Sequence, residues 1–244
     1  MKYYLSKSFM ALTMMAMVAS SAEAEEPVND VSISVNADLV SSYVWRGQKM
    51  GGVSLQPGAS VSWKGISLGA WGSYALSPTH NGTDEELDIT LGYDVKGLHV
   101  GVTDYYFFNL GHPFFKYGGL DASAHTFEGN IGYDFGVLSL NWFTNFAGQD
   151  GLNKDGDRAY SSYVQVDVPF RLGGVDCTAT LGAVPFRTSF YADDMSDGLH
   201  INTIALKAAY EVQCKKVTMP LSAQIVANPS SQGLYLVLAA GFSL

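Results

Sequence analysis

The chain has 244 residues, with 26 glycines, 14 tyrosines and 13 phenylalanines, only 15% charged residues, and a formal net charge of −9. This length accommodates one large all-β domain or two small ones, and the charged fraction is low for a soluble protein. No segment is rich in Lys or Arg. The chain therefore lacks the electrostatic pattern of a nucleic-acid-binding protein, and nucleic acid is excluded as a partner.

The first residues have the pattern of an export signal. Lys2 and Lys7 precede an apolar stretch from Phe9 to Val18, and Ala22-Glu23-Ala24 is an A-x-A cleavage site. The alternative, a membrane anchor, is disfavoured because the stretch is shorter than the ~20 residues that a spanning helix needs. We expect residues 1–24 to be a signal peptide and residues 25–244 to be the mature domain, which leaves the cytoplasm.

Beyond the signal, apolar and polar residues alternate. In "ELDITLGYDV" (86–95) the apolar residues share one face and the polar residues the other, and "VSISVNADLVSSYVWR" (31–46) repeats the pattern. A period of two residues is the period of a β-strand. About twelve such segments occur, with the following approximate bounds: 31–46, 53–64, 66–77, 86–96, 97–109, 126–135, 137–147, 158–171, 174–188, 201–213, 216–227 and 233–244.

Short turns and long loops follow one another along the chain. The short turns lie at Lys64-Gly65, Lys96-Gly97, Phe135-Gly136, Gly173-Gly174 and Lys215-Lys216, and polar or Gly-rich loops separate the other pairs of strands. In an antiparallel meander this places every long loop at one end, which is the asymmetry of an outer-membrane barrel. The sequence predicts an all-β fold, a single antiparallel up-and-down transmembrane β-barrel of about 12 strands.

Two soluble folds, a secreted β-sandwich and a lipocalin-like barrel, have the same alternation. Strand length favours the membrane barrel, because sandwich strands average about 5 or 6 residues whereas transmembrane strands need about 9 to 11. Most segments here reach the longer value. The expected location is therefore the cell outer membrane, where the partners are outer-membrane lipid and the outer-membrane barrel assembly machinery.

Aromatic residues lie near the ends of several segments, on the apolar face. In a barrel such residues form girdles at the two membrane interfaces, because amphipathic rings suit the headgroup level. A preference of aromatics for strands in general explains them equally well. The predicted girdle comprises Tyr43, Trp45, Trp63, Tyr74, Tyr93 and Trp142.

The polar faces of the segments predict which residues line the lumen. Acidic residues predominate among these candidates, which are Asp38, Arg46, Asp88, Glu128, Asp167, Lys207 and Glu211. An open lumen of this kind would favour cations over anions. Asp104 has the lipid-facing parity, and a bulge near Thr103 is one way in which it could turn inward.

The stretch "SSYVWRG" and the following "LQPGASVSW" and "ISLGAWGSYA" resemble the N-terminal hairpins of TorF-type porins and similar outer-membrane barrels of Gram-negative bacteria. The likeness covers roughly the first 80 residues and centres on S-x-Y-x-x-R-G. It implies a channel but supplies no substrate and no site residue. The last segment, "GLYLVLAAGFSL", is similar to the terminal strand of such barrels, although it ends in Leu244 where many end in an aromatic residue.

Three functions remain open. Passive diffusion of small hydrophilic solutes through a porin-like channel is favoured over a structural or adhesive barrel with a closed lumen, and over a barrel enzyme. An enzyme is disfavoured because no Ser or Asp lies at a suggestive spacing from His99, the one histidine on the lumen parity. His112, Asp121 and His125 share a loop and could ligate a metal, but solvated loop histidines are commoner. We expect no cofactor and no metal.

The two cysteines, Cys177 and Cys214, lie near the turn ends of neighbouring segments with the same parity. Export places them in an oxidising compartment, so a disulfide is one expectation and two separate lipid-facing thiols are the other. A bridge needs Cα atoms within about 7 Å, so a register shift of a few residues would prevent it.

Overall fold

The computed structural model of the chain describes residues 31–77, 85–186, 188–191, 198–214 and 217–243. The predicted signal peptide (1–24) and the predicted turn Lys215-Lys216 lie outside these residues. No helix in the described ranges is long and apolar enough to cross a membrane.

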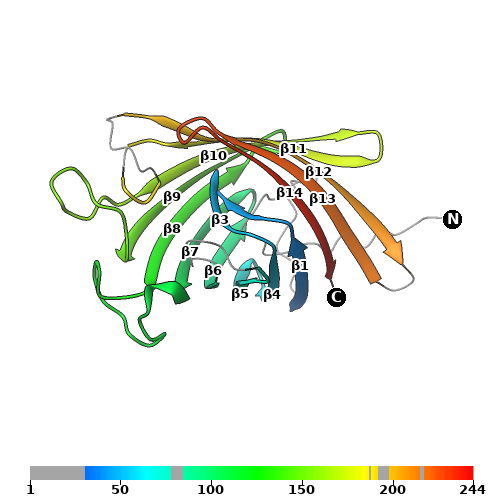
Figure 1. The fold of residues 1–244 in the computed structure, drawn as a ribbon. Coiled ribbons are helices and arrows are strands. Elements are labelled where there is room, and N and C mark those ends of the chain that lie inside the picture. Colours follow the sequence, from blue (N-terminus) through cyan, green and yellow to red (C-terminus); the bar gives the residue numbers. More distant parts are fainter. Residues whose placement is uncertain (1–30, 78–84, 187, 192–197, 215–216, 244) are drawn as a thin grey trace.

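A closed antiparallel barrel forms the fold (Figure 1), and this confirms the predicted fold class. Its wall runs in the order β1-β14-β13-β12-β11-β10-β9-β8-β7-β6-β5-β4 and returns to β1. The wall strands are β1 (Ser32–Val40), β4 (Ser54–Trp63), β5 (Ile66–Ala75), β6 (Glu86–Val95), β7 (Leu98–Phe107), β8 (His125–Asp134), β9 (Ser139–Gly148), β10 (Ser162–Leu172), β11 (Val175–Val184), β12 (His200–Cys214), β13 (Val217–Asn228) and β14 (Gly233–Ser243).

The two ends of the barrel differ in their connections, as predicted. Lys64-Gly65 and Lys96-Gly97 both have positive φ, with values of 50° and 82° in the first pair and 49° and 84° in the second. Positive φ at both central residues belongs to the two-residue type I′ turn, which suits the twist of paired strands. The longer connections lie at the other end, which we call the loop end; the 3₁₀ turn η1 (Phe108–Leu110) begins one of them.

The wall alternates in polarity along its strands. Large apolar side chains are exposed on the outside, for example Ile33, Val35 and Leu39 in β1 and Leu234, Leu236, Leu238 and Phe242 in β14. Polar side chains of the opposite parity are buried, among them Asn36, Gln56, Thr103, Asn141 and Thr178. The barrel therefore has an apolar outer surface and a polar interior, the reverse of a soluble protein.

The first predicted segment is too long, and its last part leaves the wall. β1 ends at Val40, and Val40 pairs directly with Ser54 of β4. Residues 41–53 form a separate hairpin of β2 (Tyr43–Trp45) and β3 (Gln48–Gly51), the lumen hairpin. Tyr43 and Trp45 are 4% and 5% exposed. Their assignment to the lipid-facing girdle is therefore wrong, because the chain turns into the barrel before reaching them.

Asp104 keeps its outward parity, and no bulge turns it inward. The register of β7 is continuous with both neighbours through Thr103 and Asp104. Its carboxylate lies 2.8 Å from Nδ1 of the fully buried His125, whose Nε2 contacts the backbone oxygen of Phe114. The loop after β7 covers this pair with the ring of Tyr117, 4.4 Å from the imidazole centroid. A hydrogen bond beneath a loop thus compensates a carboxylate on the outer face.

The predicted disulfide is absent. The Cys177 thiol is free, and Cys177 pairs in register with Ala208, whereas Cys214 pairs with Val217 at the end of β12. Six residues of strand separate Ala208 from Cys214, or roughly 20 Å, which is far beyond the reach of a disulfide.

Closure of the wall can be tested by a cross-strand bridge. Leu39 and Ala240 are register partners of β1 and β14, and both face outward. With Cys177 and Cys214 replaced by alanine, Leu39→Cys with Ala240→Cys should form a disulfide that mass spectrometry detects without reductant. Leu39→Cys with Leu234→Cys, six residues out of register, should leave two free thiols. Bridging in the second variant alone would contradict the closure register.

Candidate functional site

The lumen hairpin lies inside the loop-end half of the barrel (Figure 1). Its turn is Arg46-Gly47, with φ values of 48° and 76°, and Trp45 pairs with Gln48 across it. This is the same two-residue geometry as at Lys64-Gly65. At its base, the amide of Ser41 donates to the backbone oxygen of Leu238 in β14 at 2.8 Å. The hairpin is thus fixed to the wall where it departs from β1.

The tip of the hairpin is fixed to β12 and β13, the strands that follow β14 in the wall. Asn228 donates from Nδ2 to the backbone oxygen of Gly47 at 3.0 Å. A Cβ on Gly47 would lie 1.9 Å from the backbone oxygen of Asn202, so the backbones approach too closely for any other residue. Arg46 is therefore held at one place against the wall.

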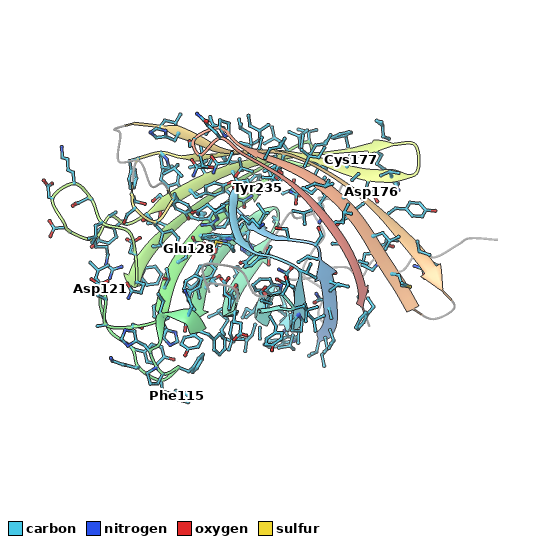
Figure 2. The ribbon with its side chains drawn as sticks, viewed as in Figure 1. Phe115, Asp121, Glu128, Asp176, Cys177 and Tyr235 are labelled. Atoms are coloured by element: carbon cyan, nitrogen blue, oxygen red, sulfur yellow. The ribbon has the colours of Figure 1, made fainter. Side chains whose placement is uncertain are left out.

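Arg46 forms a two-bonded ion pair with Glu128 of β8. Its Nη1 and Nη2 donate to Oε2 and Oε1 at 2.5 and 2.8 Å, and the side chains are 6% and 2% exposed. Tyr105 of β7 donates to Glu128 Oε1 at 2.8 Å, and Nη1 also contacts the hydroxyl of Tyr191. Figure 2 shows Glu128 within the barrel, whereas Phe115 and Asp121 lie in the loop at its end. This pairing geometry is the strongest that an arginine and a carboxylate can adopt.

Aromatic rings surround the guanidinium. Arg46 Cζ lies 4.2 Å from the ring centroid of Phe143, 4.5 Å from that of Trp45 and 4.9 Å from that of Tyr163. Burial alone would lower the pKa of Arg46, but the facing Glu128 carboxylate raises that pKa well above its ordinary value. Burial also raises the pKa of Tyr191. The wall residues Tyr105, Glu128, Phe143 and Tyr163, with Tyr191 of the loop after β11, are here called the cation cage.

A second acidic group lies beside the cage. Tyr43 of the hairpin donates to Glu86 Oε2 at 2.8 Å, and its ring packs edge-on against Trp71, with centroids 5.5 Å apart. Asp88, two residues further along β6, is 1% exposed, and its carboxylate lies against that of Glu86. Two buried carboxylates in contact are costly unless they share a proton or a cation lies beside them.

The other face of the hairpin makes an apolar contact. Val44 packs in one cluster with Val40, Ala205, Val226 and Val237, which come from β1, β12, β13 and β14. The hairpin therefore touches both sides of the lumen at once, with rings and charges on one side and small aliphatic groups on the other.

The remaining lumen candidates lie away from the hairpin. Asp167 is 2% exposed and accepts hydrogen bonds from Gln165 and Thr180. Asp38 and Lys207 face the interior and interact electrostatically. Glu211 is exposed and lies beyond Ala209, the last residue of β12 that pairs with β11. Its assignment to the lumen is wrong, because β12 and β13 extend past the wall there.

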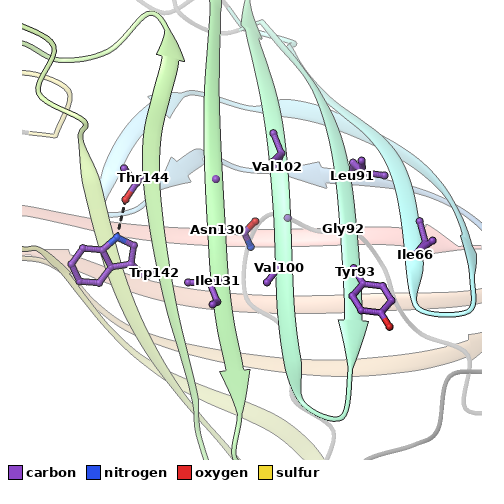
Figure 3. Close-up of a pocket in the computed structure, with 12 residues that line it drawn as sticks. Ile66, Leu91, Gly92, Tyr93, Val100, Val102, Asn130, Ile131, Trp142 and Thr144 are labelled. Carbon is purple, nitrogen blue, oxygen red and sulfur yellow. Dashed lines mark hydrogen bonds between the residues drawn. The ribbon is translucent and has the colours of Figure 1, made fainter.

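Four predicted girdle residues are exposed on the outer face: Trp63, Tyr74, Tyr93 and Trp142. Two of them border an apolar groove of about 740 Å³ on the outside of β5 to β9 (Figure 3). There Trp142 donates to Thr144 at 2.7 Å, and Ile131 and Leu91 also line the groove. This groove is on the outside of the wall and is not a path through the barrel.

Sequence reasoning missed most of the cation cage. An inward-facing side chain gives no signal of a binding site until its partner is known. The missed residues with inward parity are Tyr105, Phe143 and Tyr163 of the cage and the neighbouring Glu86. Tyr191 lies in the loop after β11, where no alternation of apolar and polar residues indicates which way a side chain faces. The signal for the hairpin was present, however, since Arg46-Gly47 repeats the basic residue and glycine of the turns at Lys64 and Lys96.

These features define a closed β-barrel protein with an internal hairpin. The family described as "Bacterial protein of unknown function (Gcw_chp)" matches residues 22–215, and the chain belongs to this family. No curated protein is significantly similar to the chain.

Solved barrels are similar in outline. The NanC porin has 9% sequence identity and a TM-score of 0.48, over 87% of this chain and 99% of that one. A BenF-like porin from Pseudomonas fluorescens Pf-5 has 13% identity and a TM-score of 0.33, over 91% and 65%. Wzi of Escherichia coli, an outer-membrane protein involved in group 1 capsule assembly, has 8% identity and a TM-score of 0.34, over 87% and 84%. With TM-scores this low, the likenesses carry no argument about function.

The ion pair should control how firmly the hairpin is held. Arg46→Ala leaves Glu128 buried without its partner, which costs about 3–5 kcal/mol in the docked state. Amide exchange measured by mass spectrometry should therefore be faster for the hairpin peptide but not for β1 and β4, which pair without it. Lys49→Ala, at an exposed hairpin residue, is the control. Adding Glu128→Gln to Arg46→Ala should recover part of the protection; an unchanged exchange rate in Arg46→Ala would contradict the role of the pair.

Proposed function

We propose that the chain is a porin-like outer-membrane channel for passive diffusion of small hydrophilic solutes, with a lumen narrowed by the lumen hairpin. The observation that carries this proposal is the polarity of the barrel, which is apolar outside and polar inside. A barrel built for an aqueous interior gives the polar lumen residues water to contact. The proposal assigns no catalytic residue and no cofactor.

Residence in the outer membrane follows from the same polarity. The exposed Leu, Ile, Val and Phe side chains of the wall would face lipid, and Trp63, Tyr93 and Trp142 near the turn end would lie at an interface. Export through a cleaved signal peptide and insertion by the barrel assembly machinery complete this part of the proposal. The likeness of the first 80 residues to TorF-type porins supports a channel without identifying its solute.

A barrel with a closed lumen and a structural or adhesive role is the second candidate. The observation that favours it is the hairpin itself, which contacts residues on opposite walls in the loop-end half. If the hairpin always remains in the lumen, its charged residues stabilise a closed core and do not select any solute.

Shortening the hairpin separates the two candidates. Because Val40 and Ser54 are register partners, residues 41–53 can be replaced by Asn-Gly, a two-residue type I′ turn. In planar bilayers this variant should conduct several times more current than the unmodified protein, because the aromatic constriction is gone. Removal of 153–157 from an exposed loop is the control and should change nothing. Absence of current in a variant that still shows the heat-dependent gel shift of a folded barrel would favour the structural role.

An open channel should prefer cations. The inward carboxylates Asp38, Glu86, Asp88, Glu128 and Asp167 outnumber Arg46 and Lys207, and acidic linings favour cations through the local field. Asp38→Asn with Asp167→Asn should move the reversal potential across a salt gradient toward zero while the conductance stays similar. Ser222→Asn, a neutral substitution on β13, is the control. Anion preference in the unmodified channel would overturn the assignment.

A further inference from the structure

We propose that the cation cage is a binding site for organic cations that carry a guanidinium group, and that Arg46 occupies it as an internal ligand. This inference rests on the proposed function, because it names the class of solute that the channel would select. Its first test uses binding alone, so that it can fail or succeed whether or not the barrel conducts.

The cage is built by the wall and the loop after β11, and not by the hairpin. Glu128 is oriented by the Tyr105 hydroxyl, which donates to it from the neighbouring strand at 2.8 Å. Phe143 and Tyr163 come from β9 and β10 and present their rings to the guanidinium from a second side. Such a set, a carboxylate that accepts two parallel N–H bonds flanked by aromatic faces, is the usual protein site for a guanidinium. It stays complete when Arg46 is removed.

The charges around the cage exceed what Arg46 neutralises. Glu86, Asp88 and Glu128 are each 5% exposed or less and lie close together on β6 and β8. Tyr105 connects them, since it pairs in register with Asp88 and its hydroxyl reaches Glu128. Arg46 pairs with Glu128, and Glu86 accepts the hydroxyl of Tyr43, but among the described residues no cationic side chain pairs with Asp88, whose carboxylate lies against that of Glu86. A second cationic group would take the place of the proton that two adjacent buried carboxylates share.

The expected ligand follows from this arrangement. β6 and β8 are two strand spacings, or about 10 Å, apart in the wall. A flexible cation with a guanidinium at one end and an ammonium at the other can place the first on Glu128 and the second near Asp88. Such a solute would compete with Arg46 for the cage, so binding and release of the hairpin would be linked.

The first test is binding to full-length mature Arg46→Ala in detergent. Millimolar ethylguanidinium should raise its unfolding midpoint in a saturable way, and N-ethylurea, which has a similar shape but no charge, should not. The unmodified protein, in which Arg46 fills the cage, should show a smaller shift, and Arg46→Ala with Glu128→Gln should show none. If Arg46→Ala does not fold, Arg46→Gln takes its place. Equal shifts with ethylguanidinium and N-ethylurea would overturn the proposal.

The second test examines the acidic pair and the current. Agmatine, which carries both a guanidinium and an ammonium, should bind Arg46→Ala more tightly than ethylguanidinium does, and Asp88→Asn should abolish that advantage. In bilayers agmatine should block current through Arg46→Ala, and Glu128→Gln should raise the half-blocking concentration by about 30-fold or more. A conducting channel that agmatine does not block would refute the inference and leave the porin proposal intact. Saturable binding without any current would support the cage and refute the channel.

Discussion

Direct pairing of β1 with β4 is the constraint on which the interior of this protein depends. Once Val40 is bonded to Ser54, the wall is continuous without residues 41–53, and these residues must lie either above the barrel or inside it. Tyr43, Val44 and Trp45 are too apolar to remain exposed, and the lumen offers rings on one side and small aliphatic groups on the other. The hairpin is therefore an inserted element, and its removal leaves the pairing of β1 with β4 unchanged.

The wall was predictable because two independent signals agreed along most of the chain. Period-two alternation gave the strands, and glycine turns such as Lys64-Gly65 gave their pairing, so β4 and β5 begin and end within two residues of the predicted bounds. The same alternation failed at Tyr43 and Trp45, because parity continues unbroken through Ser41 and Ser42 while the chain leaves the wall. Only the turn at Arg46-Gly47 could have shown that the strand ends earlier.

Two questions that the sequence left open depended on contacts that no local pattern contains. Cys177 and Cys214 share parity, but the register that separates them depends on where β11 and β12 begin to pair. Asp104 looked misplaced on the outer face because its partner, His125, and the covering loop lie far along the chain. In each case the pairing of distant segments decided which partners these residues have.

Burial makes the Arg46–Glu128 pair informative about function as well as position. A buried ion pair is weak evidence for stability, because removing two charges from water costs about as much as their attraction returns. Aliphatic residues at these positions would avoid that cost, as valine and alanine do around Val44. The charged pair differs from an aliphatic contact because a cation from solution can replace Arg46 at Glu128. A packed aliphatic side chain has no such competitor in solution. The adjacent carboxylates of Glu86 and Asp88 make the same point from the wall, since a cation beside them would relieve their mutual repulsion. A solute and the hairpin would thus compete on the side of the lumen that holds the charged and aromatic residues. On the aliphatic side around Val44, the hairpin packs against small side chains that no solute replaces.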